Sequence, residues 1–219
     1  MTGGWDWAYA VEILPALWRG LQVTLLATLL GSLLAFGLGL VFAVVQRNRV
    51  AVLHRVVWAF VQFWRSTPLL VQAYVIYQVL PDVGITLGSL AAGVLALGLH
   101  YACYTSEVYR AGIEAVPPGQ WEAAAALSLP RSRVWLAVVL PQAVPRVLPA
   151  LGNYVISMFK EVPLLLAIGL VEVVTVARQL SAESFRPVEP LTLAGILFLL
   201  ISYPASVVVR RLERRTGAR

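Results

Sequence analysis

Three charged side chains lie inside otherwise apolar stretches of this sequence. Arg65 interrupts the run from Leu53 to Leu80, and Lys160 and Glu161 interrupt the run from Val144 to Val174. A charge at the centre of a membrane helix costs about 2.5–3.5 kcal/mol on insertion scales, so such residues are candidate functional groups. A cation and an anion together suit the carboxylate and the amino or amidinium group of a zwitterionic solute.

Each of these positions has a proline close by. Pro68 follows Arg65, and Pro163 follows Glu161. Proline lacks an N–H and crowds the preceding turn, which breaks or kinks a helix. Broken helices within a membrane expose backbone groups that bind polar solutes. Two interpretations stay open for these charges: contact with a solute, or a structural ion pair or contact between subunits.

The residues needed by common catalytic motifs are missing. Lys160 is the only lysine and lies in no Gly-Lys-Ser/Thr sequence, so the chain has no Walker A loop. His54 and His100 are far apart and neither lies in an H-E-x-x-H motif, and the single Cys103 makes a zinc site or a disulfide framework unlikely. We expect no catalytic residue, metal or cofactor. We expect His100 to be hydrogen-bonded within a helix bundle and His54 to be solvated at its edge.

The composition places the chain in a membrane. It has 219 residues, of which 59% are hydrophobic and 13% charged, and its mean hydropathy is +0.79. A soluble domain carries about 25% charged residues. The net charge of +6 does not indicate nucleic-acid binding, because in a membrane protein the placement of arginine usually reports topology.

The apolar stretches predict an all-α integral membrane protein with about five spanning helices. Each span needs about 20 residues. We expect Trp5–Leu14 to lie along the outer membrane surface, Pro81–Gly84 to form a turn, and Ser181–Pro190 to form a polar loop. No internal repeat or linker is visible, so we expect one domain over residues 1–219. The predicted spans are Gly20–Gln46, Leu53–Leu80, Val83–Ser106, Val144–Val174 and Pro190–Val209.

The distribution of arginine predicts the orientation. Basic residues concentrate on the cytoplasmic side of membrane proteins. One predicted side has three arginines, Arg19, Arg178 and Arg186. The other has twelve, namely Arg47, Arg49, Arg55, Arg110, Arg131, Arg133, Arg146, Arg210, Arg211, Arg214, Arg215 and Arg219. We therefore place the 107–133 loop and the C-terminus in the cytoplasm and the N-terminus outside.

The predicted cytoplasmic loop, Glu107–Arg133, contains a short helix at Gln120–Leu127 made of strong helix formers. Glu122 would be favoured there by the helix dipole. The small residues Ala123–Ala126 would let the helix sit deep in a cleft of a partner. An ordinary amphipathic surface helix is the alternative interpretation of this segment taken alone.

Several motifs occur in a fixed order around this helix. Glu122-Ala123-Ala124 is followed four residues later by Ser128, and then by Leu140-Pro141. The other motif segments are Trp64–Gln72, Glu107–Ile113, Val116–Gln120 and Asn153–Glu161. Together they cover roughly residues 18–215, and the sequence resembles the permease subunits of ABC importers of the polar-amino-acid type.

The resemblance implies a type I permease fold with a cytoplasmic coupling helix, in a bacterial inner membrane. It implies two permeases, alike or paired with a sister subunit, two cytoplasmic ATPases that hold the enzymatic activity, and an extracytoplasmic binding protein. The ATPase-coupling residues it implies are Glu122, Ala123, Ala124, Ser128, Leu140 and Pro141. The solute-binding residues are Arg65, Asn153, Ser157, Lys160 and Glu161.

The sequence departs from the family pattern at two places. Ser128 stands where the coupling motif has glycine, and Val162-Pro163 replaces a Thr-Ser pair. The segments 184–195 and 210–215 resemble permeases described as carrying ectoine or hydroxyectoine, with ordinary polar amino acids as the alternative solutes. A secondary transporter driven by an ion gradient and a non-transporting scaffold are the competing classes. The lack of an inverted repeat and the coupling motif both argue against the former.

Overall fold

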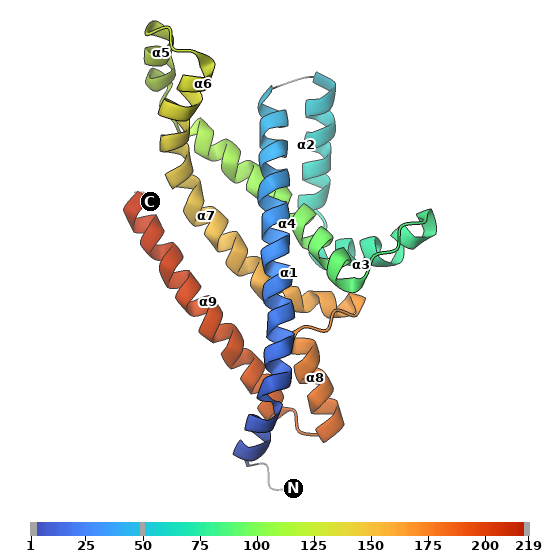
Figure 1. Cartoon of the computed structure of the whole chain (residues 1–219). Coiled ribbons are helices and arrows are strands. Elements are labelled where there is room, and N and C mark those ends of the chain that lie inside the picture. The colour runs from blue at the N-terminus through green and yellow to red at the C-terminus, as the bar shows by residue number, and fades with distance from the viewer. Residues whose placement is uncertain (1–3, 49–50, 217–219) are drawn as a thin grey trace.

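The computed structural model describes residues 4–48 and 51–216, and this part of the chain contains helices and no strand (Figure 1). In chain order the elements are α1 (Trp7–Asn48), α2 (Ala51–Arg65), α3 (Leu69–Gln78), the 3₁₀ helix η1 (Leu80–Val83), α4 (Ser89–Glu114), α5 (Pro118–Ala126), α6 (Arg131–Arg133), the π-helical η2 (Val134–Val139), α7 (Leu140–Glu161), the 3₁₀ helix η3 (Val162–Ile168), α8 (Val173–Ser184) and α9 (Val188–Thr216).

The long helix α1 forms the axis of the molecule and packs against α4, α7, α8 and α9 (Figure 1). Its 42 residues span roughly 60 Å at 1.5 Å per residue. Small residues let α4 approach it closely, as is usual between membrane helices. A Cβ added at Gly39 would collide with the side chain of Thr105, whose Oγ1 donates a hydrogen bond to the carbonyl oxygen of Ala35 at 3.0 Å. The α1–α4 pair is therefore fixed by close packing and by a buried hydrogen bond.

Three boundaries differ from the sequence prediction. Helix α1 begins at Trp7 rather than Gly20, so residues 7–14 are its first turns and not a separate surface segment. Residues Glu107–Glu114 are the end of α4 and not a loop. The predicted single stretch 144–174 is divided among α7, η3 and α8, and α8 continues to Ser184. The predicted boundaries were placed at charged residues. A helix end can carry charged residues without unwinding, so the positions of the charges did not predict where these helices begin and end.

Other expectations are confirmed. The second apolar stretch is broken at Pro68 into α2 and α3, and Gly84 closes the predicted turn with a φ of 86°. Within the described residues, three helical runs are long and apolar enough to cross a membrane: 7–47, 131–168 and 188–215. The broken pair α2–α3 and the more polar α4 correspond to the other two predicted spans.

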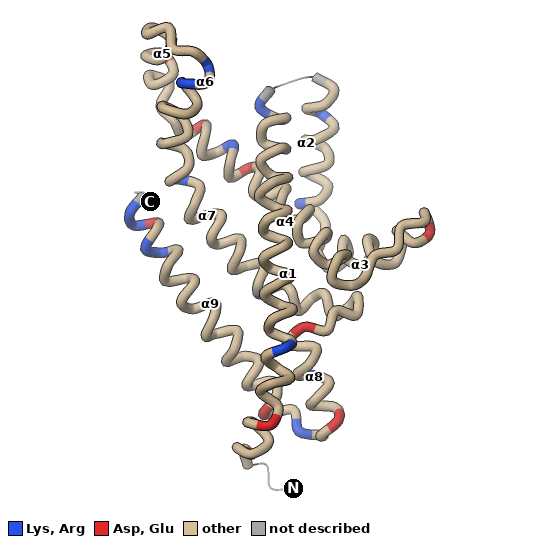
Figure 2. The backbone as a smooth tube through the Cα atoms, viewed as in Figure 1, with Lys and Arg blue, Asp and Glu red and all other residues tan. Residues whose placement is uncertain are grey.

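The basic residues of the described chain gather at one end of the molecule (Figure 2). Lys and Arg cluster where α1 ends, α2 begins, and α6 and the C-terminal turns of α9 lie. Acidic residues are more frequent at the opposite end, beside the N-terminus. There Arg186 pairs with Asp6 at 2.8 Å and with Glu189 at 3.0 Å, which ties the start of α1 to the α8–α9 connection.

Candidate functional site

The first candidate site begins at the break between α2 and α3. Pro68 cannot donate a hydrogen bond, so the last turn of α2 leaves carbonyl oxygens unsatisfied there. Gln72, which is buried, supplies the missing donor: its Nε2 donates to the carbonyl oxygens of Trp64 at 2.7 Å and Thr67 at 3.0 Å. Thr67 Oγ1 in turn donates to the carbonyl oxygen of Phe63. The break is therefore a fixed structure rather than a loose hinge.

Gln72 also connects the break to an aromatic cluster on α4 and α7, formed by Tyr101, Tyr104 and Tyr154 beside His100. The Nδ1 of His100 donates to Gln72 Oε1 at 2.9 Å, because an amide oxygen only accepts. The Tyr154 ring centroid lies 5.6 Å from that of Tyr101 and 5.9 Å from that of Tyr104. His100 is thus hydrogen-bonded within the bundle, as predicted.

Arg65 lies on one side of this cluster. Its guanidinium carbon is 5.3 Å from the centroid of the Tyr104 ring, within the range of a cation–π interaction. Its Nη1 is 3.9 Å from Glu107 Oε1, and Glu107 also pairs with Arg110 at 3.2 Å. The buried Nε of Arg65 has no hydrogen-bond partner in the described structure. One donor of this cation is therefore left unused.

Glu161, the last residue of α7, lies beside another ring of the cluster, that of Tyr101. The side chains of Glu161 and Ser157 lie beside the Tyr101 hydroxyl. Glu161 Oε2 is buried and has no hydrogen-bond partner among the described residues. Glu161 also forms no ion pair with any of these residues. A buried carboxylate oxygen without a donor costs roughly 1–3 kcal/mol or more, so it is primed for a ligand that supplies one.

Two predicted solute-binding residues lie elsewhere. Asn153 is exposed and its Nδ2 donates to Glu213 Oε1 at 3.2 Å, which links α7 to α9. Lys160 is exposed and takes no part in the ion pairs of the described chain. The structure therefore brings together Arg65, Ser157 and Glu161 but not the other two. Sequence reasoning missed the tyrosines as site residues, although their spacing on α4 and their position beside His100 were visible.

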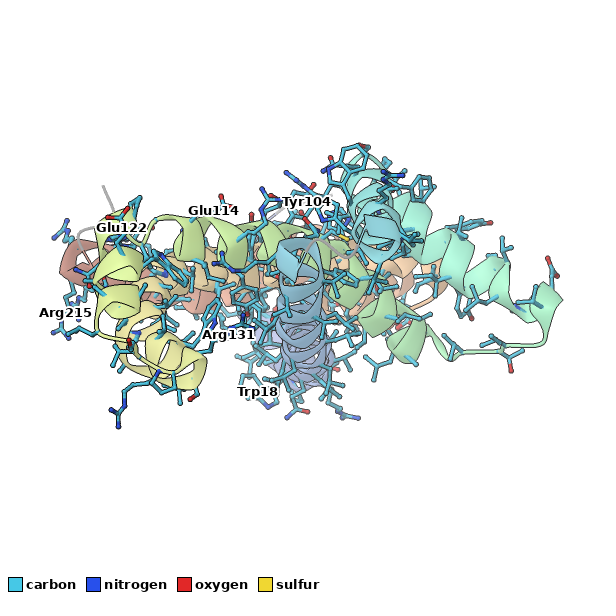
Figure 3. The ribbon with its side chains drawn as sticks, turned by 90° about the horizontal axis from the view of Figure 1, so that it is seen from above. Trp18, Tyr104, Glu114, Glu122, Arg131 and Arg215 are labelled. Atoms are coloured by element: carbon cyan, nitrogen blue, oxygen red, sulfur yellow. The ribbon has the colours of Figure 1, made fainter. Side chains whose placement is uncertain are left out.

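The second candidate site is the short helix α5, which projects at the basic end of the molecule. In the end-on view Glu122 lies at the margin of the molecule, away from Tyr104 (Figure 3). The helix starts at Pro118, two residues before the prediction, so Glu122 lies past the first turn and gains little from the helix dipole. Glu122 and Ala123 are exposed, and Leu127 is 73% exposed. Ala124, however, is buried against its own chain and is not available to a partner.

The end of α5 explains the glycine of the family motif. Ser128 has a φ of 51°, the left-handed conformation that glycine adopts without strain. The N–H of Leu129 donates to the carbonyl oxygen of Ala124 at 3.1 Å, and the N–H of Ser128 donates to that of Ala125 at 2.9 Å. This pair of bonds is the Schellman arrangement that closes a helix. Ser128 therefore adopts a backbone conformation that suits glycine, the residue of the motif, despite its side chain.

The last coupling-motif residues follow a π-helical segment. Residues Val134–Val139 form η2, and α7 starts at Leu140. Pro141 has no N–H and its ring crowds the preceding turn, and the wider π-helical turn relieves that crowding. Leu140 and Pro141 are both exposed. They lie beside the base of α5, where Gln142 Nε2 is 3.5 Å from Gln120 Oε1.

Comparison with known proteins decides the family. The model of the binding-protein-dependent transport system inner membrane component matches residues 35–218. The chain belongs to this family. The permease is 44% identical over 209 residues to the probable amino-acid ABC transporter permease protein y4tG of Sinorhizobium fredii, covering 95% of this chain and 90% of that protein. It is 34% identical to the octopine transport system permease protein OccM of Rhizobium radiobacter, and the match covers 94% of this chain and 86% of that protein.

Solved structures agree. The permease superposes with a TM-score of 0.89 and 32% identity on a chain of an amino acid ABC transporter crystallised with histidines, covering 97% of this chain and 99% of that one. A chain of the MetNI methionine ABC transporter, with a TM-score of 0.71 and 24% identity, shows the same fold. These matches establish the protein as the membrane permease of an amino-acid ABC importer with the predicted all-α type I fold. They favour this class over an ion-driven secondary transporter.

Proposed function

We propose that the permease carries a small zwitterionic solute past the tyrosine cluster, with Arg65 and Glu161 facing its two charged ends. The arrangement that supports this proposal is an unused guanidinium N–H beside Tyr104 and an unpartnered carboxylate oxygen beside Tyr101, two rings of the same cluster. A cation and an anion separated by aromatic rings match a solute that bears a carboxylate and an amino or amidinium group. Ser157 adds a hydroxyl on the Glu161 side.

Energy for transport enters through α5. We infer that the transporter contains two cytoplasmic ATPase subunits and that one of them binds the exposed residues Glu122, Ala123 and Leu127 of this α5. Ser128, Leu140 and Pro141 fix the end and the base of the helix. Ala124 supports the helix from inside. A second permease, identical or a sister subunit, completes the membrane part, and an extracytoplasmic binding protein delivers the solute. Movement of α5 when the ATPases bind ATP would open the central path outward.

The solute proposal is tested with Glu161→Gln in the purified complex of permease, ATPase and binding protein. We expect unchanged assembly and basal ATPase activity and a large loss of uptake, because the amide loses the charge that faces the solute. Glu183→Gln, at an exposed position on α8, is the matched control and should transport normally. Poor assembly would instead support a buried ion pair between Glu161 and another subunit, since breaking such a pair costs about 3–5 kcal/mol. Normal uptake and normal assembly would contradict both readings.

The solute itself is distinguished by stimulation of the ATPase. Relatives of the permease are named for octopine, arginine and glutamine. The segments 184–195 and 210–215 resemble ectoine permeases, and we propose ectoine, a cyclic zwitterion, as the solute. Ectoine with the binding protein should then stimulate ATP hydrolysis. Stimulation by glutamine or arginine alone would refute the ectoine assignment and leave the permease function intact.

The orientation proposal places the basic end in the cytoplasm. Single cysteines replacing the exposed Gln120 and Glu183, in a Cys103→Ser background, should react with impermeant reagents from opposite sides of the membrane. Cys103 is buried, so its replacement removes a weakly reactive background thiol. Labelling of both sites from the same side would refute an outer N-terminus with a cytoplasmic α5.

A further inference from the structure

The cytoplasmic-end turn of α1 is linked to the coupling helix by a single cation. The guanidinium carbon of Arg47 lies 5.1 Å from the centroid of the Trp121 ring on α5 and 5.2 Å from that of Trp135 in η2. The two indoles meet edge to face, with centroids 5.8 Å apart and planes at 82°. Both distances lie within the range of about 6 Å over which a cation is attracted to an aromatic face. We call these three residues the arginine clamp.

The two tryptophans are themselves anchored. They pack with Ile113 and Val134 against a small buried cluster of Val116, Val139 and Ala143. This cluster joins α5 to η2, to the start of α7 and to the segment that follows α4. The aromatic half of the clamp therefore moves with α5 and η2 as one apolar unit.

The other half belongs to α1, which packs little against α5 and η2 directly in the described structure. A surface pocket of about 410 Å³ is bordered by Arg47 together with Trp121, Glu114 and Glu122. The end of α1 is thus not sealed against α5 by close packing. Loss of the Arg47 side chain would remove this direct contact and leave α4, whose Ile113 packs with the tryptophans and whose Arg110 bonds Gln46, to join the two parts.

A movement of α1 would reach the tyrosine cluster directly. Thr105 on α4 donates to the carbonyl oxygen of Ala35 on α1, and Gly39 opposes the same threonine. Tyr101 and Tyr104 lie within one turn of Thr105 on α4. Near the clamp, Arg110 also donates to Gln46 Oε1 at 3.2 Å, which holds the ends of α1 and α4 together.

We propose that Arg47 is a positioning residue for ATP-driven transport, which transmits movement of α5 to α1 and so to the tyrosine cluster. The inference rests on the proposed binding of α5 to the ATPase. A cation over aromatic faces suits the task because the attraction is electrostatic and needs no fixed hydrogen-bond geometry. The rings can slide beneath the guanidinium while the connection persists.

The test uses the assembled complex with its binding protein and compares Arg47→Gln, Arg47→Lys and Arg55→Gln. Arg55 is exposed on the neighbouring α2, so its replacement removes the same charge from the same end of the molecule. We expect Arg47→Gln to assemble and to keep its basal ATPase rate. The stimulation of ATPase activity by solute-loaded binding protein should fall about threefold to tenfold, and uptake should fall in parallel. Arg47→Lys retains a cation and should recover an intermediate value. Arg55→Gln should match the unmodified protein.

Three outcomes would overturn the proposal: stimulation in Arg47→Gln equal to that of Arg55→Gln, failure of Arg47→Gln to assemble, or no recovery in Arg47→Lys. Trp121→Phe provides a second check, because the weaker ring should reduce stimulation less than Arg47→Gln does. A cysteine at Ala126 cross-linked to the ATPase reports α5 binding separately. If the otherwise unmodified protein gives no cross-link, the proposed coupling role of α5 fails. If Arg47→Gln keeps the cross-link but shows reduced stimulation of the ATPase, the result supports the arginine clamp.

Discussion

Replacing Ser128 with glycine should stabilise the end of the coupling helix. Ser128 holds a φ of 51°, and a non-glycine residue pays roughly 1–2 kcal/mol in this left-handed region. Glycine loses about 0.5–1 kcal/mol more backbone entropy on folding, which offsets part of the gain. The net effect is about 0.5–1 kcal/mol. Since about 1.4 kcal/mol is a factor of ten, this corresponds to roughly twofold to fivefold less local opening.

Hydrogen exchange of the purified complex measures this effect at the amides that close the helix. The N–H of Leu127 donates to the carbonyl oxygen of Ala123, and that of Leu129 donates to Ala124. Both amides should exchange twofold to fivefold more slowly in Ser128→Gly, because they are released only when the helix end opens. Uptake should be retained, because the family motif has glycine at this position.

Two control variants separate strain relief from a general effect of glycine. Ser128→Ala keeps a Cβ in the left-handed conformation and should give no added protection. Ser132→Gly, on the short α6, places glycine at a helical position and should reduce local protection. Unchanged or faster exchange of Leu127 and Leu129 in Ser128→Gly would refute the argument that Ser128 is strained.

Three further variants test other contacts. Gly39→Val would place a side chain where α4 touches α1, so it should reduce the yield of folded permease, measured by gel filtration, far more than Gly37→Val, which faces open space. Gln72→Leu removes the side-chain donor of the Thr67 carbonyl oxygen at the α2–α3 break and the acceptor of His100 Nδ1, and should cost about 1–3 kcal/mol, seen as a lower thermal midpoint. A hydrogen bond from the Tyr9 N–H and the Arg186 guanidinium hold the pKa of Asp6 below its ordinary value of 3.8. The stabilisation from Asp6 is therefore present above about pH 4 and lost as the pH falls through the lowered pKa. Near pH 4, pepsin should cleave the N-terminal segment of Asp6→Asn faster than that of the unmodified protein, because the variant lacks the ion pair with Arg186.

The sequence by itself determined the features that depend on local chemistry. The apolar stretches specified a helical membrane protein, and Pro68 specified the break between α2 and α3, because proline removes a backbone donor wherever it stands. The strong helix formers at 120–127 located α5 within two residues of its observed start. The sequence also showed that Ser128 stands where the motif has glycine, and the observed φ of 51° gives the physical reason for a glycine there.

The tertiary structure decided which distant residues meet. Tyr104 and Tyr154 are separated by 50 positions, and Arg47 and Trp135 by 88, so no local pattern predicts that their side chains touch. The same holds for Asn153, which the structure assigns to Glu213 on α9, and for Ala124, which turns toward its own chain. Helix formation follows from neighbouring residues, whereas these contacts follow from how whole helices cross and which face each presents. Only the packed bundle therefore shows that Arg65 and Glu161 face one aromatic cluster.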